Sequence, residues 1–461
     1  MDNQEFRKYG YEVVDWIADY LENIRQYPVL PGMQPGDLMD QLPPAAPEQG
    51  ESMDCIFDDF QRLILPAVTH WNHPRFLAYF SISASEPGIL GEMLTAALNA
   101  NGMVWKTCPA LTELEQVTLG WLRQWLGLPP EFFGIIYDTA SMSTLHAIAA
   151  AREMVDPGAR TRGSRGDLVM YISEHANLSV EKAGITLGLG QDNVRKIAVD
   201  EGFRMRADLL RLAMDSDRQA GKKPFCVVPT VGTTSTSSID PLNAIADVAE
   251  EFGAWLHVDA AYGGMAAVVP ELRHVLAGAE RAHSVVVNPH KWLFTPIDLS
   301  AFYTREPEIL RRAFSLVPEY LKTADDPRAV NFMDYGVQLG RRFRALKLWF
   351  VMRYFGHERI ADIIRTHIRY AQELAALIRS HPDFELAAPV PFSLICFRYR
   401  GSDEDNRALL DRVNASGKAF LSHTALNGQT VLRLAIGNIG TNWKDLSEVW
   451  ELVQHAAKRT G

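Results

Sequence analysis

The feature that most constrains the fold is a regular alternation of short apolar runs and helical segments between about residues 135 and 304. The apolar runs have the length and composition of buried strands, and they are DLVMYIS, PFCVVPT, AWLHVDA, HSVVVNP and SAFYTR. Two stretches between them repeat apolar residues at helical spacing, ADLLRLAMDSDRQ and PLNAIADVAEEFG, and we expect Asp240 to cap the second. This alternation predicts an α/β fold with a largely parallel sheet that is covered on both faces.

The segments on either side have different patterns. Asp2 and Glu5 match a capping box at the start of a helix, and a connector rich in Pro and Gly separates this helix from a second one over about 53–70. After the alternating region, a long helical stretch precedes a hairpin at Asn427-Gly428 and a closing helix. We therefore predict three parts, a helical N-terminal arm (1–75), a large domain (76–345) and a small α+β C-terminal domain (346–461).

Composition and charge exclude several classes of function. The net charge is −10, whereas a nucleic-acid partner requires a basic face. No apolar run approaches the roughly 20 residues of a membrane span, and the first residues lack the apolar core of a signal peptide. The four cysteines are far apart without a CxxC pair, which is typical of a reducing compartment and excludes a thiolate zinc site. We expect a cytoplasmic protein with a small-molecule substrate and no nucleic-acid, membrane or metal partner.

Polar residues follow several of the predicted strands. Asp259 ends the strand in LHVDAAY, Asn288, His290 and Lys291 follow three valines, and Thr234 follows the strand in PFCVVPT. Ligands of open parallel sheets bind beyond the carboxyl ends of the strands, so we expect these side chains to meet at one edge.

Lys291 lies in an apolar setting, where a charged ammonium is costly unless it is paired or used. Each residue has a structural alternative, because Asp259 could cap a turn and Lys291 could reach solvent with its ammonium. Taken together, a lysine, a carboxylate and a hydroxyl-rich helix start (YDTASMS) match what pyridoxal 5′-phosphate requires. Desolvation lowers the pKa of a lysine and makes it a better Schiff-base amine. We interpret Lys291 as the cofactor lysine.

A set of ordered motifs resembles a known family: NHPRFLAYF, TELE, LHVDAAYGG, NPHKWLF and LGRRFRALKLWFVMRYFG. They are similar to the group II pyridoxal-phosphate decarboxylases, the aromatic L-amino-acid decarboxylase family. The resemblance implies fold type I, which is aspartate aminotransferase-like, and an obligate homodimer with active sites at the subunit interface. It also implies that the N-terminal arm packs across the partner subunit.

The resemblance assigns roles to individual residues. Lys291 matches the Schiff-base lysine, Asp259 the partner of the pyridine nitrogen, and Thr234 a threonine near the ring. The remaining cofactor positions are Ala261 under the ring, His290 beside the lysine, and Thr139, Ala140, Ser141 and Asn288 around the phosphate. Asp138 replaces the usual glycine, and we expect it to turn away from the phosphate and cap the helix.

The substrate pocket is also implied by the resemblance. Trp71, Tyr79 and Phe80 match pocket positions, although core packing is an equally good interpretation of Tyr79 and Phe80. Residues around Asn101, Met103 and Trp105 are expected to come from the other subunit. Met103 makes the pocket less aromatic than the usual pattern, so an aromatic substrate is only a default.

Two departures from the family pattern concern the chemistry. Asn177 stands where a histidine stacks on the cofactor ring, and Phe332 stands where a mobile loop carries a tyrosine that donates a proton to the substrate α-carbon. Phenylalanine has no proton to give. The alternative is drift or a shift of register, with His175 or Tyr335 taking the role.

Each departure individually resembles the family's aldehyde synthases. The resemblance therefore favours decarboxylation-dependent oxidative deamination, with O2 as co-substrate and an aldehyde, CO2, ammonia and H2O2 as products. The alternatives are simple decarboxylation to the amine, β-elimination on a cysteine conjugate, and a homologue without catalytic activity.

Overall fold

The structure is a computed structural model that describes residues 1–316 and 328–458. The chain divides into two compact units. One unit consists of Met1–Ser81, Ile378–Glu385 and Phe397–Gly461, and the other of Ile82–Leu377 and Leu386–Cys396. The three-part division at residues 75 and 345 stays a prediction.

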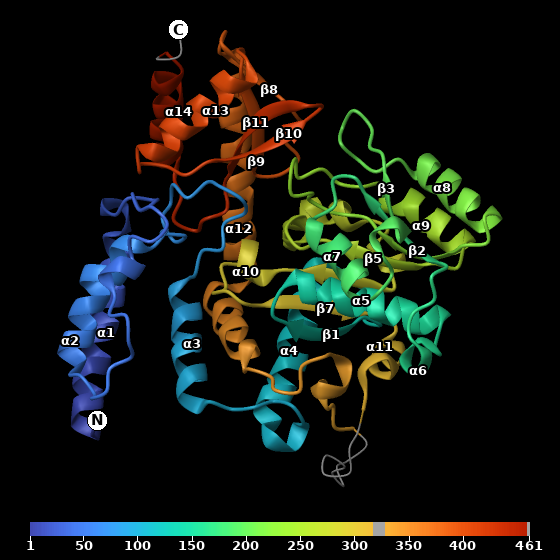
Figure 1. Ribbon diagram of the computed structural model, residues 1–461, viewed down its shortest axis with the longest axis horizontal. Helices are drawn as coiled ribbons and strands as arrows, with labels where there is room; N and C mark the ends of the chain where they lie inside the picture. Colours follow the sequence, from blue (N-terminus) through green and yellow to red (C-terminus); the bar gives the residue numbers. More distant parts are fainter. Residues whose placement is uncertain (317–327, 459–461) are drawn as a thin grey trace. The chain divides into compact units, whose positions relative to one another are not determined.

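A seven-stranded sheet organises the larger unit (Figure 1). Its order is β1-β7-β6-β5-β4-β2-β3, and β7 runs antiparallel to both of its neighbours while the other pairs are parallel. The strands are β1 Phe133–Tyr137, β2 Leu168–Ser173, β3 Val194–Ile197, β4 Lys223–Val228, β5 Trp255–Asp259, β6 Ser284–Val287 and β7 Ser300–Thr304. The predicted α/β fold with a mostly parallel sheet is confirmed.

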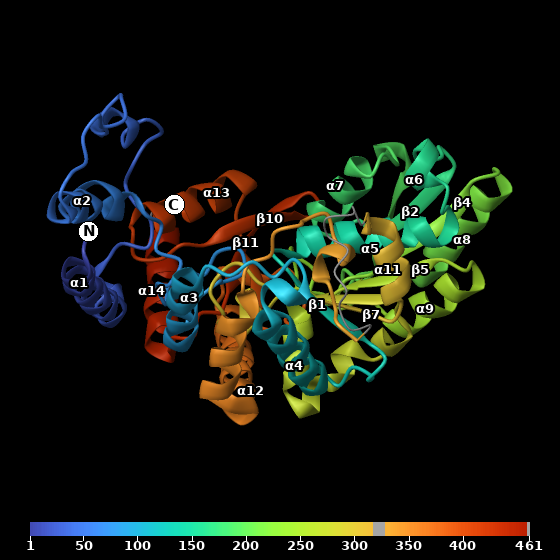
Figure 2. The same cartoon turned by 90° about the horizontal axis from the view of Figure 1, so that it is seen from below.

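Helices cover both faces of this sheet, with α5 and α7 on one side and α9 on the other (Figure 2). The helices of this region are α3 Glu86–Leu98, α4 Pro109–Leu126, α5 Ala140–Val155, α6 Ala159–Arg162, α7 Leu178–Thr186, α8 Ala207–Gln219, α9 Leu242–Glu251, α10 Pro289–Trp292, α11 Pro307–Phe314 and α12 Arg344–Ser380. The last is kinked at Gly356, whose φ is 69°.

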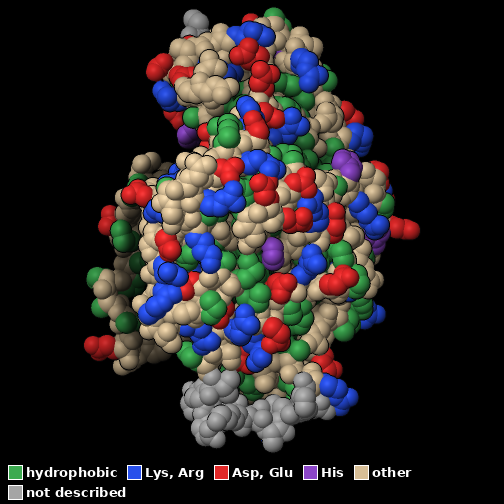
Figure 3. Space-filling view, turned by 90° about the vertical axis from the view of Figure 1, so that its right-hand side faces the viewer, with side chains coloured by type: hydrophobic (Ala, Val, Ile, Leu, Met, Phe, Trp, Pro, Cys, Tyr) green, Lys and Arg blue, Asp and Glu red, His purple; other side chains and the backbone are tan. Residues whose placement is uncertain are grey.

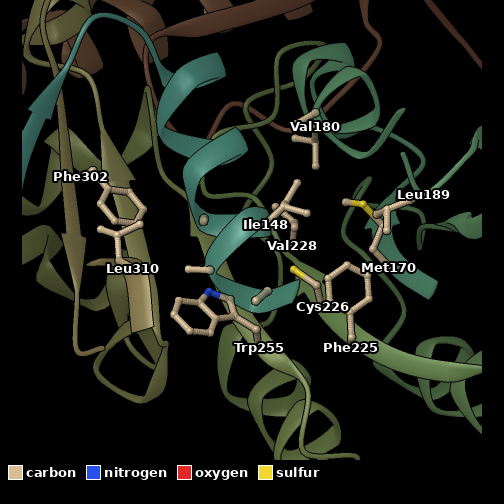
Figure 4. Packing of buried hydrophobic residues seen from close by; sticks show 14 of the residues in the cluster. Ile148, Met170, Val180, Leu189, Phe225, Cys226, Val228, Trp255, Phe302 and Leu310 are labelled. Atoms are coloured by element: carbon tan, nitrogen blue, oxygen red, sulfur yellow. The ribbon is translucent and has the colours of Figure 1, made fainter. Parts of the chain in front are cut away.

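The core of the larger unit lies between α5 and the sheet. Ile148 of α5 is fully buried near Val228 and Trp255, while Met170 and Phe302 extend the same cluster to either side (Figure 4). Each such side chain contributes roughly 1.5–3 kcal/mol by leaving water. This packing fixes α5 on the sheet, so the start of the helix lies immediately after the carboxyl end of β1.

The N-terminal helix α1 (Asn3–Glu22) begins with the predicted capping box. Asp2 accepts hydrogen bonds from the backbone of Glu5, and the Glu5 side chain accepts one from the Asp2 backbone. Its partner is α2 (Met53–Asp59), and the Trp16 ring contacts Phe57 and Phe60 edge-on at 6.4 and 5.0 Å between centroids. Two helices of the predicted arm are thus paired through aromatic side chains.

A second sheet has four strands in the order β10-β11-β9-β8. Its strands are β8 Phe384–Leu386, β9 Leu394–Tyr399, β10 Ser422–Leu426 and β11 Gln429–Ala435. Helices α13 (Asp403–Ala415) and α14 (Trp443–Ala457) accompany it. The predicted hairpin is confirmed, because Asn427 and Gly428 join β10 to β11 with φ of 51° and 79°.

One predicted cap is wrong. Helix α9 starts at Leu242 with Pro241 at its N-cap position, and Asp240 does not cap it. The buried Asp240 carboxylate instead accepts hydrogen bonds from the backbone N–H of Met205 and Thr230, both at 2.7 Å. Burial raises the pKa of Asp240 to about 6. Asp240 therefore joins two loops.

On the face shown in Figure 3, basic and acidic side chains alternate over the surface without a one-sided basic patch. Within residues 1–316 and 328–458, every helix is too short or too polar to span a membrane.

Candidate active site

Lys291 lies on the single-turn helix α10, which begins one residue after the buried strand β6 ends. Pro289 starts this helix, and the backbone N–H of Lys291 donates to the carbonyl of Asn288 at 2.9 Å. Lys291 is partly accessible, whereas Trp292 next to it is fully buried. Burial lowers the pKa of the Lys291 ammonium, and the negative charge of Asp259 opposes this shift. A lysine of this kind has the properties of an amine nucleophile.

Asp259 ends β5, the strand that lies beside β6 in the sheet. Its side chain is buried, and Oδ1 accepts a hydrogen bond from the Ala261 backbone N–H at 3.1 Å. Burial raises the pKa of this carboxyl, and the positive charge of Lys291 opposes the shift. The two strand ends thus bring a carboxylate and an amine into electrostatic contact. Their roles as pyridine-nitrogen partner and cofactor lysine stay predictions.

Asn288 and His290 are buried next to each other, and their hydrogen bonds show which nitrogen of His290 carries the proton. The Leu299 backbone N–H donates to His290 Nδ1 at 3.0 Å, so the neutral imidazole carries its proton on Nε2. Burial and the charge of Lys291 lower the pKa of His290 to about 3, which keeps the ring neutral. His290 Nε2 lies 3.3 Å from Asn288 Nδ2, and two donors repel.

Rotating the Asn288 amide by 180° resolves this conflict. Its oxygen then accepts from His290, and its NH2 group takes the buried place of Oδ1, which has no hydrogen-bond partner among the described residues. Asn288 thereby offers a desolvated donor beside Lys291. A phosphate oxygen requires such a donor, so this residue fits the phosphate position that the resemblance gives it.

The start of α5 supplies further donors. Thr139 is its N-cap residue, Ala140 and Ser141 form the first turn, and no side chain caps the helix. The uncapped amides and the helix dipole favour an anion here. These residues fit the phosphate positions as well.

The prediction that Asp138 caps α5 is wrong. Its carboxylate Oδ1 accepts hydrogen bonds from the Thr139 backbone N–H at 2.5 Å and from the Thr139 hydroxyl at 3.0 Å. Its other oxygen accepts one from Gln338 Nε2 at 3.2 Å. The short side chain reaches the adjacent residue and not the N–H groups one turn along the helix.

Asn177 is the N-cap residue of α7. Its Oδ1 accepts from the Ser179 backbone N–H at 3.0 Å, and its Nδ2 donates to Thr234 Oγ1 at 2.9 Å. The structure therefore joins two predicted site residues, Asn177 and Thr234. His175, the alternative in the sequence, packs edge-on against Phe203 with 5.4 Å between ring centroids.

Phe332 begins a 3-10 turn, Phe332–Tyr335, and its ring is 2% exposed. The Arg341 guanidinium lies 4.4 Å from the ring centroid, and Phe133 and Tyr335 are its aromatic neighbours. Phe332 thus belongs to the core cluster beside α5. Tyr335 and Phe133 pack in the same cluster.

The remaining predicted positions differ in their surroundings. Ala261 is buried, and its carbonyl accepts from the Asn288 backbone N–H at 3.0 Å. Met103 is partly exposed, and its carbonyl accepts from the Met333 backbone N–H at 3.0 Å. The predicted pocket aromatics belong to the other compact unit, and they are Trp71, Tyr79 and Phe80.

The three pocket aromatics differ in their packing and exposure. The Trp71 ring stacks on Phe76 at 4.1 Å between centroids and on Tyr79 at 6.0 Å. Tyr79 is 52% exposed with a φ of 51°, whereas Phe80 is buried. Tyr79 is therefore largely exposed, whereas Phe80 packs in the core.

The sequence analysis missed the residues that hold the segment after Phe332. His146 of α5 stacks on Tyr137 with 4.1 Å between centroids, and its Nε2 accepts from the Val337 backbone N–H at 3.0 Å. The Tyr137 hydroxyl donates to the carbonyl of Tyr335. The only sequence signal was a histidine within the apolar pattern of STLHAIAAA, which looks like an ordinary core position.

Comparisons with known proteins agree with this arrangement. Residues 35–400 match the pyridoxal-dependent decarboxylase conserved domain. Phenylacetaldehyde synthase of a Rosa hybrid cultivar is 40% identical over 484 residues, covering 99% of this chain and 95% of that protein.

Solved structures are also similar over the whole chain, among them a decarboxylase and an aldehyde synthase. Tryptophan decarboxylase of Catharanthus roseus in complex with L-tryptophan has a TM-score of 0.95 and 37% identity, covering 100% of this chain and 99% of that one. The 4-hydroxyphenylacetaldehyde synthase of Rhodiola rosea has a TM-score of 0.93 and 34% identity, again covering 100% and 99%.

The fold and the lysine–carboxylate pair define a fold type I pyridoxal-phosphate enzyme. More narrowly, the chain belongs to the pyridoxal-dependent decarboxylase family, whose members here include aromatic amino-acid decarboxylases and phenylacetaldehyde synthases. Its cofactor is pyridoxal phosphate.

Proposed function

We propose that this enzyme converts an L-amino acid into an aldehyde by decarboxylation-dependent oxidative deamination. The balanced reaction takes the amino acid, O2 and water to the aldehyde, CO2, ammonia and H2O2. Aromatic L-amino acids are the first candidates, because the relatives carry names of that substrate class. The aldehyde is preferred over the amine because of the residue at position 332.

The residues of this chain have defined tasks in that reaction. Lys291 would hold the cofactor through its amine, Asp259 would face the pyridine nitrogen, and Asn288 with the start of α5 would hold the phosphate. When bound, pyridoxal phosphate supplies the electron sink that makes loss of CO2 from the substrate feasible. Asp259 is buried, so water screens its negative charge only weakly. The charge therefore stabilises a nearby cation more strongly than it would in solution.

The single observation that carries the aldehyde proposal is the lack of an acidic proton at position 332. After CO2 leaves, the α-carbon must take up a proton for the amine product to form. The Phe332 side chain has no proton to donate. Loss of a positioned general acid slows protonation by roughly 10²–10⁴-fold. When protonation of the α-carbon is slow, oxidation by O2 can compete with it.

The alternative donors in the sequence are poor acids in their surroundings. Burial raises the pKa of the Tyr335 phenol, and burial lowers the pKa of His175, so this imidazole is mostly unprotonated at neutral pH. Asn177 carries an amide, which does not ionise in this pH range and is therefore not a general acid, and both of its polar atoms are hydrogen-bonded. These properties support the aldehyde as the product.

We also propose a homodimer. Helix α1 has no buried residue, and Phe6 and Tyr11 are 69% and 63% exposed. Helix α3 exposes Leu90, Leu94 and Leu98 as well. Apolar side chains in such numbers on two helices are typical of an interface with a second copy.

The test is product analysis on a panel of L-amino acids with simultaneous readings of CO2, O2 uptake, aldehyde, amine and H2O2. We expect one aldehyde and one H2O2 for each CO2 from the wild-type enzyme. Lys291→Ala should form none of these products. Amine as the main product, without O2 uptake, would identify an ordinary decarboxylase. Pyruvate and a thiol from a cysteine conjugate, with no CO2, would identify the elimination reaction.

A further inference from the structure

We propose that the Asp138 carboxylate competes with the cofactor phosphate for the hydrogen-bond donors of Thr139 and thereby lowers the affinity of the enzyme for phosphate. The inference rests on the assignment of Thr139, Ala140 and Ser141 to the phosphate. It does not depend on whether the product is an aldehyde or an amine.

The competition follows from the hydrogen bonds of one carboxylate oxygen. Asp138 Oδ1 accepts from the Thr139 backbone N–H at 2.5 Å and from the Thr139 hydroxyl at 3.0 Å. An N–H has a single proton and a hydroxyl has a single proton, so a phosphate oxygen that uses either donor must displace the carboxylate. Both donors stand at the N-cap position of α5, where an anion also gains from the helix dipole.

Charge adds to this competition. A phosphate monoester carries about −1.5 to −2 charges at neutral pH, and an adjacent carboxylate repels it. Asp138 is partly buried, so solvent screens this repulsion less than it would at an open surface. The carboxylate can relieve the repulsion only by moving away from Thr139.

Gln338 determines where the carboxylate can go. Its Nε2 donates to Asp138 Oδ2 at 3.2 Å, so the outer oxygen has a partner on the side away from Thr139. Gln338 follows Val337, whose backbone N–H is held by His146 of α5. Because Gln338 is exposed and its hydrogen bond is long, this contact is weak compared with the two bonds to Thr139.

Asp138→Asn removes the negative charge and keeps the size of the side chain, and its amide oxygen can still accept a hydrogen bond from Thr139. Asp138→Gly removes the acceptor altogether. Gln338→Ala is the matched control, since it removes the outer partner and leaves the carboxylate in place. Affinity is measured by calorimetry on the full-length apoenzyme with inorganic phosphate, pyridoxal 5′-phosphate and pyridoxal.

We expect Asp138→Asn to bind inorganic phosphate and pyridoxal phosphate at least tenfold more tightly than the wild type. Asp138→Gly should gain at least as much, and Gln338→Ala should change by less than threefold. Pyridoxal has no phosphate, so its affinity should be the same in all four proteins. An unchanged pyridoxal affinity shows that the rest of the site is intact.

Unchanged or weaker phosphate affinity in both Asp138 variants, with unchanged pyridoxal affinity, would overturn the inference. Phosphate that fails to compete with pyridoxal phosphate in any of the proteins would overturn it together with the assignment of Thr139–Ser141. Neither outcome bears on product identity, which the O2 and product measurements decide separately.

Discussion

Asn177 donates from Nδ2 to Thr234 Oγ1 at 2.9 Å while its Oδ1 caps α7 through the Ser179 N–H at 3.0 Å. One amide therefore fixes the start of a helix and a threonine on a different loop. Whatever Asn177 contributes to the chemistry, it also holds two parts of the site together.

These two tasks can be separated by mutation. Asn177→Asp keeps an oxygen for the cap and loses the donor to Thr234, whereas Asn177→Ala loses both. Loss of an N-cap costs about 0.5–2 kcal/mol, so thermal unfolding should show Asn177→Ala destabilised and Asn177→Asp close to the wild type. Equal stability of all three proteins would contradict the capping role.

The Lys291–Asp259 pair predicts a pH dependence. Burial lowers the pKa of Lys291 below its ordinary value of 10.5, and the charge of Asp259 opposes that shift. Asp259→Asn removes the opposing charge, so the pKa of Lys291 should fall further and more free amine should be present at a given pH. The measurement is the pH profile of amine-directed labelling of Lys291 in the apoenzyme.

The labelling midpoint should move to lower pH in Asp259→Asn. Lys8 serves as an internal reference, because its ammonium is exposed to the reagent and its partner Asp54 is unchanged. A midpoint that stays in place or moves to higher pH would show that the two groups are not electrostatically coupled.

Gly336 has no room for a side chain. A Cβ there would lie 2.8 Å from His146 Nε2 and 3.2 Å from the Tyr137 ring, and both neighbours are buried. Gly336→Ala should therefore destabilise the enzyme by about 1–3 kcal/mol, as overpacking does. Gly340→Ala is the control in the same segment, since its Cβ would meet only Asn101 Nδ2 at 3.8 Å. Denaturant unfolding that ranks the two variants equally would contradict the docking of this segment on α5.

Features with a local physical cause could be predicted from the sequence. The capping box at Asp2, the Asn427-Gly428 turn and the buried strands each depend on neighbouring residues, and the structure confirms all three. That Lys291 and Asp259 interact could also be inferred, because each stands at or just after the end of one of two strands expected to be parallel, whereas their roles in the chemistry stay predictions.

Features that depend on tertiary packing could not be predicted. Asp240 and Asp138 looked like helix caps because both precede a helix, yet each has partners that the fold alone brings near. Phe332 looked like a loop residue, but Arg341 and Phe133 enclose its ring. The antiparallel direction of β7 leaves no mark on an apolar run of five residues.

Phe332→Tyr should shift products from aldehyde towards amine. The new phenol restores a group that can donate a proton, while release of CO2 precedes the branch and should change little. Phe332→Leu is the matched control, because leucine disturbs the contact with Arg341 without adding a proton. If Phe332→Leu gives as much amine as Phe332→Tyr, packing and not proton supply determines the product.

The most direct test of the central claim is the ratio of O2 consumed to CO2 released by the wild-type enzyme, followed with an oxygen electrode and a CO2 assay in the same reaction. Oxidative deamination takes one O2 for each CO2, so we predict a ratio near one, with peroxide and aldehyde formed in equal amounts. A ratio near zero, with amine as the product for every accepted substrate, would contradict the account and leave an amine-forming decarboxylase.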